Sequence, residues 1–165
     1  EETYLNIISS KTASLFAAAT KVGAIIAEKD LKYKNALEFY GKNLGLTFQI
    51  ADDTLDYNSE LKLFGKNIGN DFYEGKVTLP IILLYQKVNK FDKEKLKSFF
   101  EKDTREKEDL EHVLVLIKKN NIINECYKKA EHYINLASNS LSVFEESEEK
   151  NILKNLTSFS IERNF

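Results

Sequence analysis

Three aspartates near the middle of the chain are the residues whose type and spacing point most directly to chemistry. Asp52, Asp53 and Asp56 fall within about two turns of a predicted helix, beside an apolar stripe. Carboxylates at this spacing repel one another unless a cation neutralises them. The potential ligands are oxygens only, so a hard ion such as Mg²⁺ fits better than Zn²⁺. Because Mg²⁺ usually completes its shell with water and phosphate oxygens, the aspartates predict a phosphorylated ligand.

A segment rich in glycine and lysine follows the aspartates and supplies what such a ligand needs. Gly65, Gly69 and Gly75 permit tight turns in the backbone. Lys66 and Lys76 are placed to reach a polyanion. The sequence therefore predicts that the acids hold a metal and the lysines hold phosphates.

The elements that must position these residues are predicted to be helices throughout. Apolar residues recur at helical spacing and no strand alternation competes with them, so the predicted fold class is all-α. The expected helices cover residues 4–27, 31–57, 79–88, 93–102, a stretch from about 103 to 121, 122–144, and about 145–161. Asp30 and Asp92 are predicted N-caps, and Pro80 is expected at the start of its helix.

Two further features of these helices predict how they pack. Gly41 and Gly45 interrupt the helix that carries the aspartates, at a cost of about 1 kcal/mol each relative to alanine, which indicates close contact with another helix. In the last helix, five apolar residues are expected to pack inward: Ile152, Leu153, Leu156, Phe159 and Ile161.

Composition excludes several classes of protein. A length of 165 residues suggests a single domain, and a net charge of −2 gives no bulk attraction to nucleic acid or an anionic membrane. No apolar stretch approaches the roughly 20 residues of a membrane span. Cys126 stands alone, which excludes an internal disulfide and fits a reducing cytoplasm, the predicted location. Arg105 and Arg163 are the only arginines, so bidentate arginine recognition of phosphate is not expected.

The run from Gln49 to Pro80, with its FQIADDTLDY, GKNIGNDFYEGK and TLP segments, resembles the second aspartate-rich region of the trans-isoprenyl diphosphate synthases, or polyprenyl synthetases. The stretch 4–13 is similar to the Lys-Thr-Ala helix of that family. The GKNIGND run and the ending near residues 161–163 most resemble the long-chain bacterial members, the octaprenyl diphosphate synthases. The resemblance runs from Tyr4 to about Arg163 and covers nearly the whole chain.

The resemblance implies the C-terminal half of an isoprenoid-synthase-type helical bundle. Family members carry an earlier aspartate-rich motif, followed by paired arginines, that this sequence lacks. Residues 1–165 are therefore expected to form a single helical domain, a partial polyprenyl synthetase domain. The absence of methionine supports the interpretation as a fragment.

The implied activity is that of a prenyltransferase of isoprenoid and quinone side-chain biosynthesis. It elongates an allylic diphosphate with isopentenyl diphosphate, and Mg²⁺ assists ionisation of the diphosphate. By resemblance, Asp52 and Asp56 hold the Mg²⁺ and Asp53 supports the same cluster. Asp71 is a secondary candidate, as acceptor of a metal-bound water.

The remaining implied site residues contact the substrates. By resemblance, Lys11 and Lys66 stabilise the charge of the leaving diphosphate, and Thr12 and Gln49 position it through hydrogen bonds. Lys76 is a secondary phosphate ligand. The intact enzyme is expected to be a homodimer.

Three alternatives bear on this interpretation. An EF-hand is set aside, because counting from Asp52 places Thr54 and Tyr57 where an acidic ligand and a glycine should be. A terpene cyclase shares the ionisation chemistry, but the lysine-rich loop is typical of elongating enzymes. The remaining alternative is a non-catalytic fragment, or a subunit that needs a separately encoded N-terminal half and exposes large apolar patches on its own.

Overall fold

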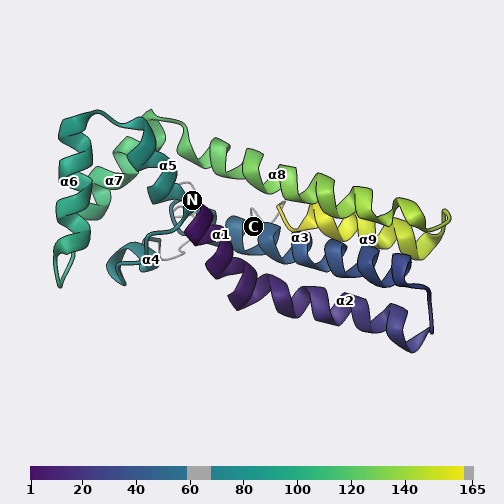
Figure 1. The fold of residues 1–165 in the computed structure, drawn as a ribbon. Helices are drawn as coiled ribbons and strands as arrows, with labels where there is room; N and C mark the ends of the chain where they lie inside the picture. Colours follow the sequence, from purple (N-terminus) through teal and green to yellow (C-terminus); the bar gives the residue numbers. More distant parts are fainter. Residues whose placement is uncertain (59–67, 162–165) are drawn as a thin grey trace. The chain divides into compact units, whose positions relative to one another are not determined.

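The computed structural model of the chain describes residues 1–58 and 68–161. Every element assigned in these ranges is helical, which confirms the all-α prediction. The chain divides into two compact units (Figure 1), and the divisions fall inside helices, after Ala51 and after Tyr127. Unit 1 contains residues 52–127 with Glu1, and unit 2 contains residues 2–51 and 128–165. That residues 1–165 form one domain stays a prediction.

Unit 2 is built around the long helix that leads to the aspartates. Its elements are α1 (Glu2–Ile8), the π-helical segment η1 (Ser9–Ala13), α2 (Ser14–Ile26), most of α3 (Leu31–Leu55), most of α8 (Ile122–Ser140), the 3₁₀ turn η3 (Leu141–Val143) and α9 (Glu148–Phe159). A buried cluster joins α3 to the end of α8, with members Tyr40, Leu44, Ala137 and Leu141. Side chains of α2 and α9 pack against this cluster, so four helices share one core.

Unit 1 holds the segment that follows the aspartates. It contains α4 (Asn70–Tyr73), α5 (Leu79–Lys87), α6 (Lys90–Glu101) and α7 (Lys107–Lys119). The ring of Phe72 is fully buried and meets Phe99 and Phe100 edge-on, at centroid distances of 6.3 and 5.5 Å. This aromatic contact anchors the short α4 to α6.

Most predicted helices are confirmed to within a few residues, and two differences have clear causes. The predicted first helix is interrupted by η1. The prediction missed this interruption because a π turn leaves no signature in apolar spacing. Asp92 is not the cap of α6, which begins at Lys90. Asn89 takes that role, because its side-chain oxygen accepts from the backbone N–H of Asp92 at 3.0 Å.

The prediction for the last helix was wrong about which residues face inward. Three of the five expected inside are exposed: Ile152, Leu156 and Phe159. Lys150, Leu153 and Thr157 form the inward stripe instead. The ammonium of Lys150 can be buried because it donates to the backbone oxygen of Phe144 and to Glu146, both at 2.7 Å. Apolar spacing predicted an inward stripe with Ile152 and Leu156, and packing buries the stripe with Lys150 and Thr157 instead.

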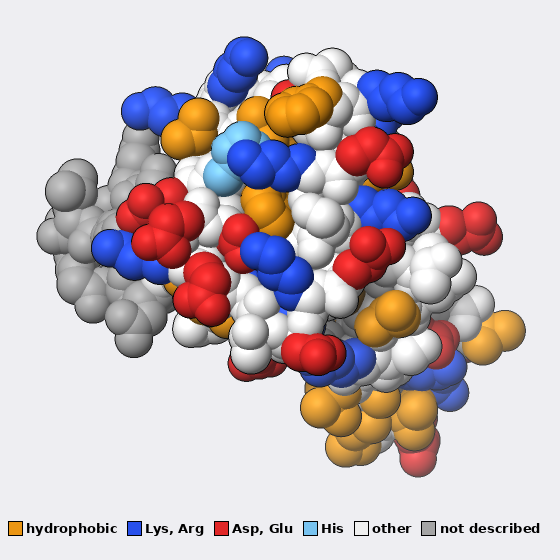
Figure 2. Space-filling model, turned by 90° about the vertical axis from the view of Figure 1, so that its left-hand side faces the viewer, with side chains coloured by type: hydrophobic (Ala, Val, Ile, Leu, Met, Phe, Trp, Pro, Cys, Tyr) orange, Lys and Arg blue, Asp and Glu red, His pale blue; other side chains and the backbone are white. Residues whose placement is uncertain are grey.

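Charged side chains of both signs are interspersed over the face drawn in Figure 2. This distribution agrees with the small net charge of −2, which gives no bulk attraction to a polyanion. Phosphate binding would therefore depend on particular lysines rather than on the overall field.

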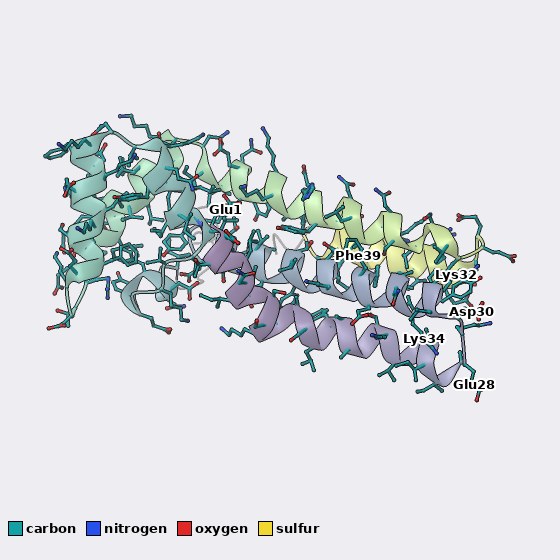
Figure 3. All side chains as sticks on the ribbon, in the orientation of Figure 1. Glu1, Glu28, Asp30, Lys32, Lys34 and Phe39 are labelled. Carbon is teal, nitrogen blue, oxygen red and sulfur yellow. The ribbon has the colours of Figure 1, made fainter. Side chains whose placement is uncertain are left out.

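Replacing Glu28 by glycine is expected to stabilise the chain by about 0.5–1 kcal/mol. Glu28, labelled in Figure 3, lies in the turn that follows α2 and has φ of 51°. The N–H of Glu28 bonds to Ile25 O and that of Lys29 to Ala24 O, which is the Schellman pattern that glycine favours. Urea unfolding of E28G measures the gain. The control A27G, where φ is −79°, should be destabilising, and a loss of stability in E28G would contradict the prediction.

Replacing Lys102 by glutamine is expected to lower stability at pH 7 by about 0.2–1 kcal/mol. The Lys102 ammonium lies 2.6 Å from Asp109 and lowers the pKa of that carboxyl. The contribution of this ion pair to stability is therefore complete above the pKa of Asp109 in the unfolded state. It is lost as pH falls through the lower pKa of Asp109 in the folded state. Urea unfolding from pH 7 to 2.5 should show K102Q converging on the parent at low pH. K107Q, whose pair with Glu111 spans 3.6 Å between exposed groups, is the control with the smaller effect.

Candidate functional site

In unit 2, two residues of the predicted substrate group are in direct contact. The hydroxyl of Thr12 donates to the side-chain oxygen of Gln49 at 2.9 Å. Thr12 belongs to η1, and Gln49 to α3. Lys11 precedes Thr12 in the same π turn and is exposed. Single π turns inside α-helices are frequent at functional sites, which agrees with a role for this segment.

Close contact between the first helices and α3 makes that hydrogen bond possible. A Cβ on Gly45 would lie 2.6 Å from the Cα of Ala13, and one on Gly41 would lie 2.4 Å from the backbone oxygen of Phe16. The hydroxyl of Thr20 bridges the same helices, because it donates to the backbone oxygen of Leu37 at 2.6 Å. The predicted helix contact at these glycines is confirmed.

Replacing Gly45 by alanine is therefore expected to cost about 1–3 kcal/mol, because the backbone of Ala13 cannot yield to the added methyl group. Urea unfolding followed by far-UV circular dichroism measures the change. Gly23 supplies the matched control, since a Cβ there meets nothing within 4 Å. G23A should gain about 0.5–1 kcal/mol from helix propensity, and equal behaviour of the two variants would contradict this packing.

In unit 1, the three aspartates are in different surroundings. Asp52 is exposed, Asp53 is buried with 6% of its surface accessible, and Asp56 is half-buried at the turn that ends α3. Across residues 1–58 and 68–161, no group of three or more carboxylate, imidazole or thiol side chains is gathered to hold a metal. The assignment of these aspartates as metal ligands stays a prediction.

Asp56 connects the aspartates to the segment that follows. Its carboxylate accepts from the backbone N–H of Asn70 at 3.0 Å and from that of Asp71 at 2.9 Å, and its carbonyl accepts from Gly69 at 2.8 Å. The carboxylate thus caps the first turn of α4. Burial raises the pKa of Asp56, although the amide hydrogen bonds oppose the shift and the charge of Asp71 adds to it. The negative charge is therefore incompletely compensated.

The far end of α4 carries Lys76. Gly75 has φ of 75°, its N–H bonds to Phe72 O at 3.0 Å, and the N–H of Lys76 bonds to Asp71 O at 2.8 Å. This is a Schellman turn, in which glycine takes the left-handed position without strain. The Lys76 ammonium lies 2.6 Å from Glu74 and 3.1 Å from Asp71, and these two carboxylates raise its pKa. The two carboxylates therefore favour the charged form of Lys76.

The donor set fits a hard divalent cation. The side chains of Asp52, Asp53 and Asp56 offer oxygens alone, and the raised pKa of Asp56 indicates a charge that a cation would stabilise. Lys66, the other predicted phosphate ligand in this segment, lies outside the described residues.

Sequence analysis did not single out two residues of unit 1 that the structure connects to this region. Tyr57 is 1% exposed; burial first, and then the charge of Asp56, raise the pKa of its phenol. An interaction with the side chain of Thr78 opposes this shift. Arg105 contacts the backbone of α4. Apolar spacing gives no signal for Arg105, which lies 32 positions from Tyr73 in the sequence, whereas Tyr57 adjoins the aspartates.

A family model described as polyprenyl synthetase matches residues 1–117 of the chain. The chain belongs to this family. Its curated relatives include a short chain isoprenyl diphosphate synthase of Methanothermobacter thermautotrophicus, 34% identical over 99% of this chain and 50% of the relative. The octaprenyl diphosphate synthase of Haemophilus influenzae is 32% identical over 100% of this chain and 50% of the relative.

Solved polyprenyl synthases share the fold. The enzyme of Caulobacter crescentus, crystallised with calcium and isoprenyl diphosphate, matches 100% of this chain and 50% of its own with a TM-score of 0.92 and 35% identity. The predicted half of an isoprenoid-synthase-type bundle is thereby confirmed. This polyprenyl synthetase chain spans about half the length of the relatives it matches. The relatives of similar identity include both a short-chain and an octaprenyl diphosphate synthase.

Within the described ranges, every helix of this family member is too short or too polar to cross a membrane.

Proposed function

We propose that the chain is the C-terminal half of a trans-polyprenyl diphosphate synthase, which joins an allylic diphosphate to isopentenyl diphosphate. The proposed metal is a divalent cation, specifically Mg²⁺, at Asp52, Asp53 and Asp56. The intact enzyme is proposed to be a cytoplasmic homodimer.

The observation that carries the proposal is the hydrogen-bonded connection from Asp56 through α4 to Lys76. Asp56 caps the start of α4, and Lys76 sits in the turn that ends it. A carboxylate suited to a metal and a cation suited to a phosphate therefore lie at opposite ends of the short helix α4. Prenyl diphosphate chemistry needs this pairing, because the leaving group is a metal-bound polyanion.

The chain's residues would act on the leaving diphosphate and on its position. Lys76, with Lys11 and Lys66, would stabilise the negative charge that develops as the allylic C–O bond breaks. A divalent cation bound at the aspartates would neutralise the same charge. The double bond of isopentenyl diphosphate then attacks the allylic carbon, a C–C bond forms, and a proton is lost. Thr12 and Gln49, already paired at 2.9 Å, would orient the allylic diphosphate.

Calorimetric titration with a non-reactive allylic diphosphate analogue tests the proposal. Binding is expected in the presence of Mg²⁺; omission of Mg²⁺ should abolish it, and the substitution D52N should weaken it about 10- to 100-fold. D103N is the matched control, because Asp103 is an exposed carboxylate of unit 1 outside the motif. Equal binding by D52N and the parent would contradict the assignment of Asp52 as a metal ligand.

A second candidate function is that of a non-catalytic subunit that needs a separately encoded N-terminal half. The favouring observation is an apolar stripe on α2, in which Leu15 and Ile26 are 73% and 77% exposed and Val22 is 46% exposed. Exposed apolar stripes of this kind mark interaction surfaces. The relatives have a further half that this chain does not span, and that half is the proposed partner.

Co-expression with the N-terminal half of the Haemophilus influenzae relative distinguishes the two functions. Prenyl transfer by this chain alone would argue against the subunit function. Turnover only in the co-purified pair would support it. The substitution L15E should then abolish co-purification, whereas S10E, at an exposed position of η1, should have little effect.

A further inference from the structure

The side chain of Arg105 joins the ends of two helices in unit 1. Its Nη1 donates to the backbone oxygen of Tyr73 at 3.3 Å, and its Nη2 donates to that of Phe100 at 3.2 Å. Tyr73 is the last residue of α4, and Phe100 lies in the last turn of α6. The guanidinium therefore bridges two helix C-termini.

A complete account of the α4 carbonyls shows why a side chain is needed there. Three of the four carbonyls are used by the turn itself: Asn70 O accepts from Glu74, Asp71 O from Lys76, and Phe72 O from Gly75. The carbonyl of Tyr73 is the fourth, and it accepts from Arg105. Carbonyls at a helix C-terminus carry partial negative charge, so a cation is favourable at this position.

Arginine suits this position better than lysine. The guanidinium is a planar fork whose separate N–H groups can reach two carbonyls at once, whereas an ammonium is a single point charge. The guanidinium carbon also lies 5.4 Å from the centroid of the Phe100 ring, a cation–π contact. The geometry thus uses both the shape and the charge of the arginine side chain.

Gly75 and Arg105 fit each other. A Cβ on Gly75 would lie 2.7 Å from Arg105 Nη2, and its φ of +75° disfavours any other residue. The guanidinium therefore rests on the turn at the point where the chain leaves α4. Lys76 is the next residue, and its ammonium pairs with Asp71 and Glu74.

We propose that Arg105 is a positioning residue that holds the Gly75 turn so that the ammonium of Lys76 stays beside Asp71. The consequence for phosphate binding rests on the function proposed above for Lys76. Both hydrogen bonds described above for the Arg105 guanidinium go to backbone carbonyls. Its effect on a bound diphosphate is therefore transmitted through Lys76.

Amide hydrogen exchange on the full chain tests the positioning without any ligand. In R105A, a peptide covering residues 70–78 should exchange at least about tenfold faster. Peptides of α2 and of the N-terminal part of α3 should be unchanged. R105K should exchange faster than the parent, because one ammonium cannot replace both guanidinium contacts. Unchanged exchange at residues 70–78 in R105A would overturn the proposal.

Binding of inorganic pyrophosphate with Mg²⁺ tests the consequence through a double-mutant cycle. R105A should weaken binding about tenfold when Lys76 is present, and less than about twofold in a K76A background. A merely structural role of Arg105 would give the same loss in both backgrounds, and that result would overturn the proposal. K107A, a change at an exposed lysine of α7, is the charge control.

The two proposals fail in different ways. Absence of Mg²⁺-dependent pyrophosphate binding by the parent chain counts against the proposed function, and the exchange experiment then decides the role of Arg105 alone. Binding by the parent that R105A leaves unchanged counts against the positioning role and leaves the proposed function intact.

Discussion

Replacing Phe72 by alanine is expected to lower the free energy of unfolding by about 3–5 kcal/mol. The side chain is fully buried, and its ring meets Phe99 and Phe100 edge-on. Alanine would remove these contacts and leave a cavity that the helical backbone cannot close. Since small domains are stable by only about 5–15 kcal/mol, the loss is a large share of the total. Urea unfolding followed by far-UV circular dichroism measures it.

Phe91 provides the matched control for this prediction. It lies on α6, the helix that also carries Phe99, but is 75% exposed. F91A is expected to change stability by less than about 0.5 kcal/mol. Since Phe72 anchors α4, F72A should also accelerate amide exchange at Lys76. A stability loss in F72A no greater than that in F91A would contradict the aromatic core described for unit 1.

Replacing Asp56 by alanine is expected to have two effects, because this carboxylate caps α4 and is also a proposed metal ligand. Loss of the cap on α4 should cost about 1 kcal/mol of stability, since the N–H groups of Asn70 and Asp71 lose their acceptor. Loss of a metal ligand should weaken Mg²⁺-dependent pyrophosphate binding about 10- to 100-fold. Chemical unfolding and calorimetry measure the two effects separately.

Asp52 separates these roles, because it is exposed and does not cap α4. D52A should weaken Mg²⁺-dependent binding to a similar extent while changing stability by less than about 0.5 kcal/mol. If D56A lost stability but bound pyrophosphate as the parent does, Asp56 would be a cap alone. The metal would then have to be held by other carboxylates.

Agreement between sequence and structure is best where periodicity is strong. The helix predicted at 31–57 is observed at Leu31–Leu55, and that predicted at 122–144 is observed as α8 followed by η3. Residues with a local conformational requirement were also predictable: Pro80 opens α5, and Gly41 and Gly45 mark a close helix contact. These features depend on neighbouring residues or on the size of one side chain, which the sequence states directly.

Apolar periodicity was insufficient to predict burial where a helix has two possible inward faces. In α9 the stripe with Lys150 and Thr157 is buried and the stripe with Ile152 and Leu156 is exposed. Both stripes have helical spacing, and the buried stripe contains Lys150, whose ammonium donates to the backbone oxygen of Phe144. The π turn that contains Thr12 likewise gave no signal in the apolar spacing.

The sequence by itself determined the all-α fold, the family and the identity of the candidate ligands, because apolar spacing and short motifs are local properties. Tertiary structure decided what those ligands do in the protein. It made Asp56 a helix cap, brought the Thr12 hydroxyl to Gln49 and placed Arg105 on the turn before Lys76. Each of these contacts joins residues at least 14 positions apart, and only folding brings such residues together.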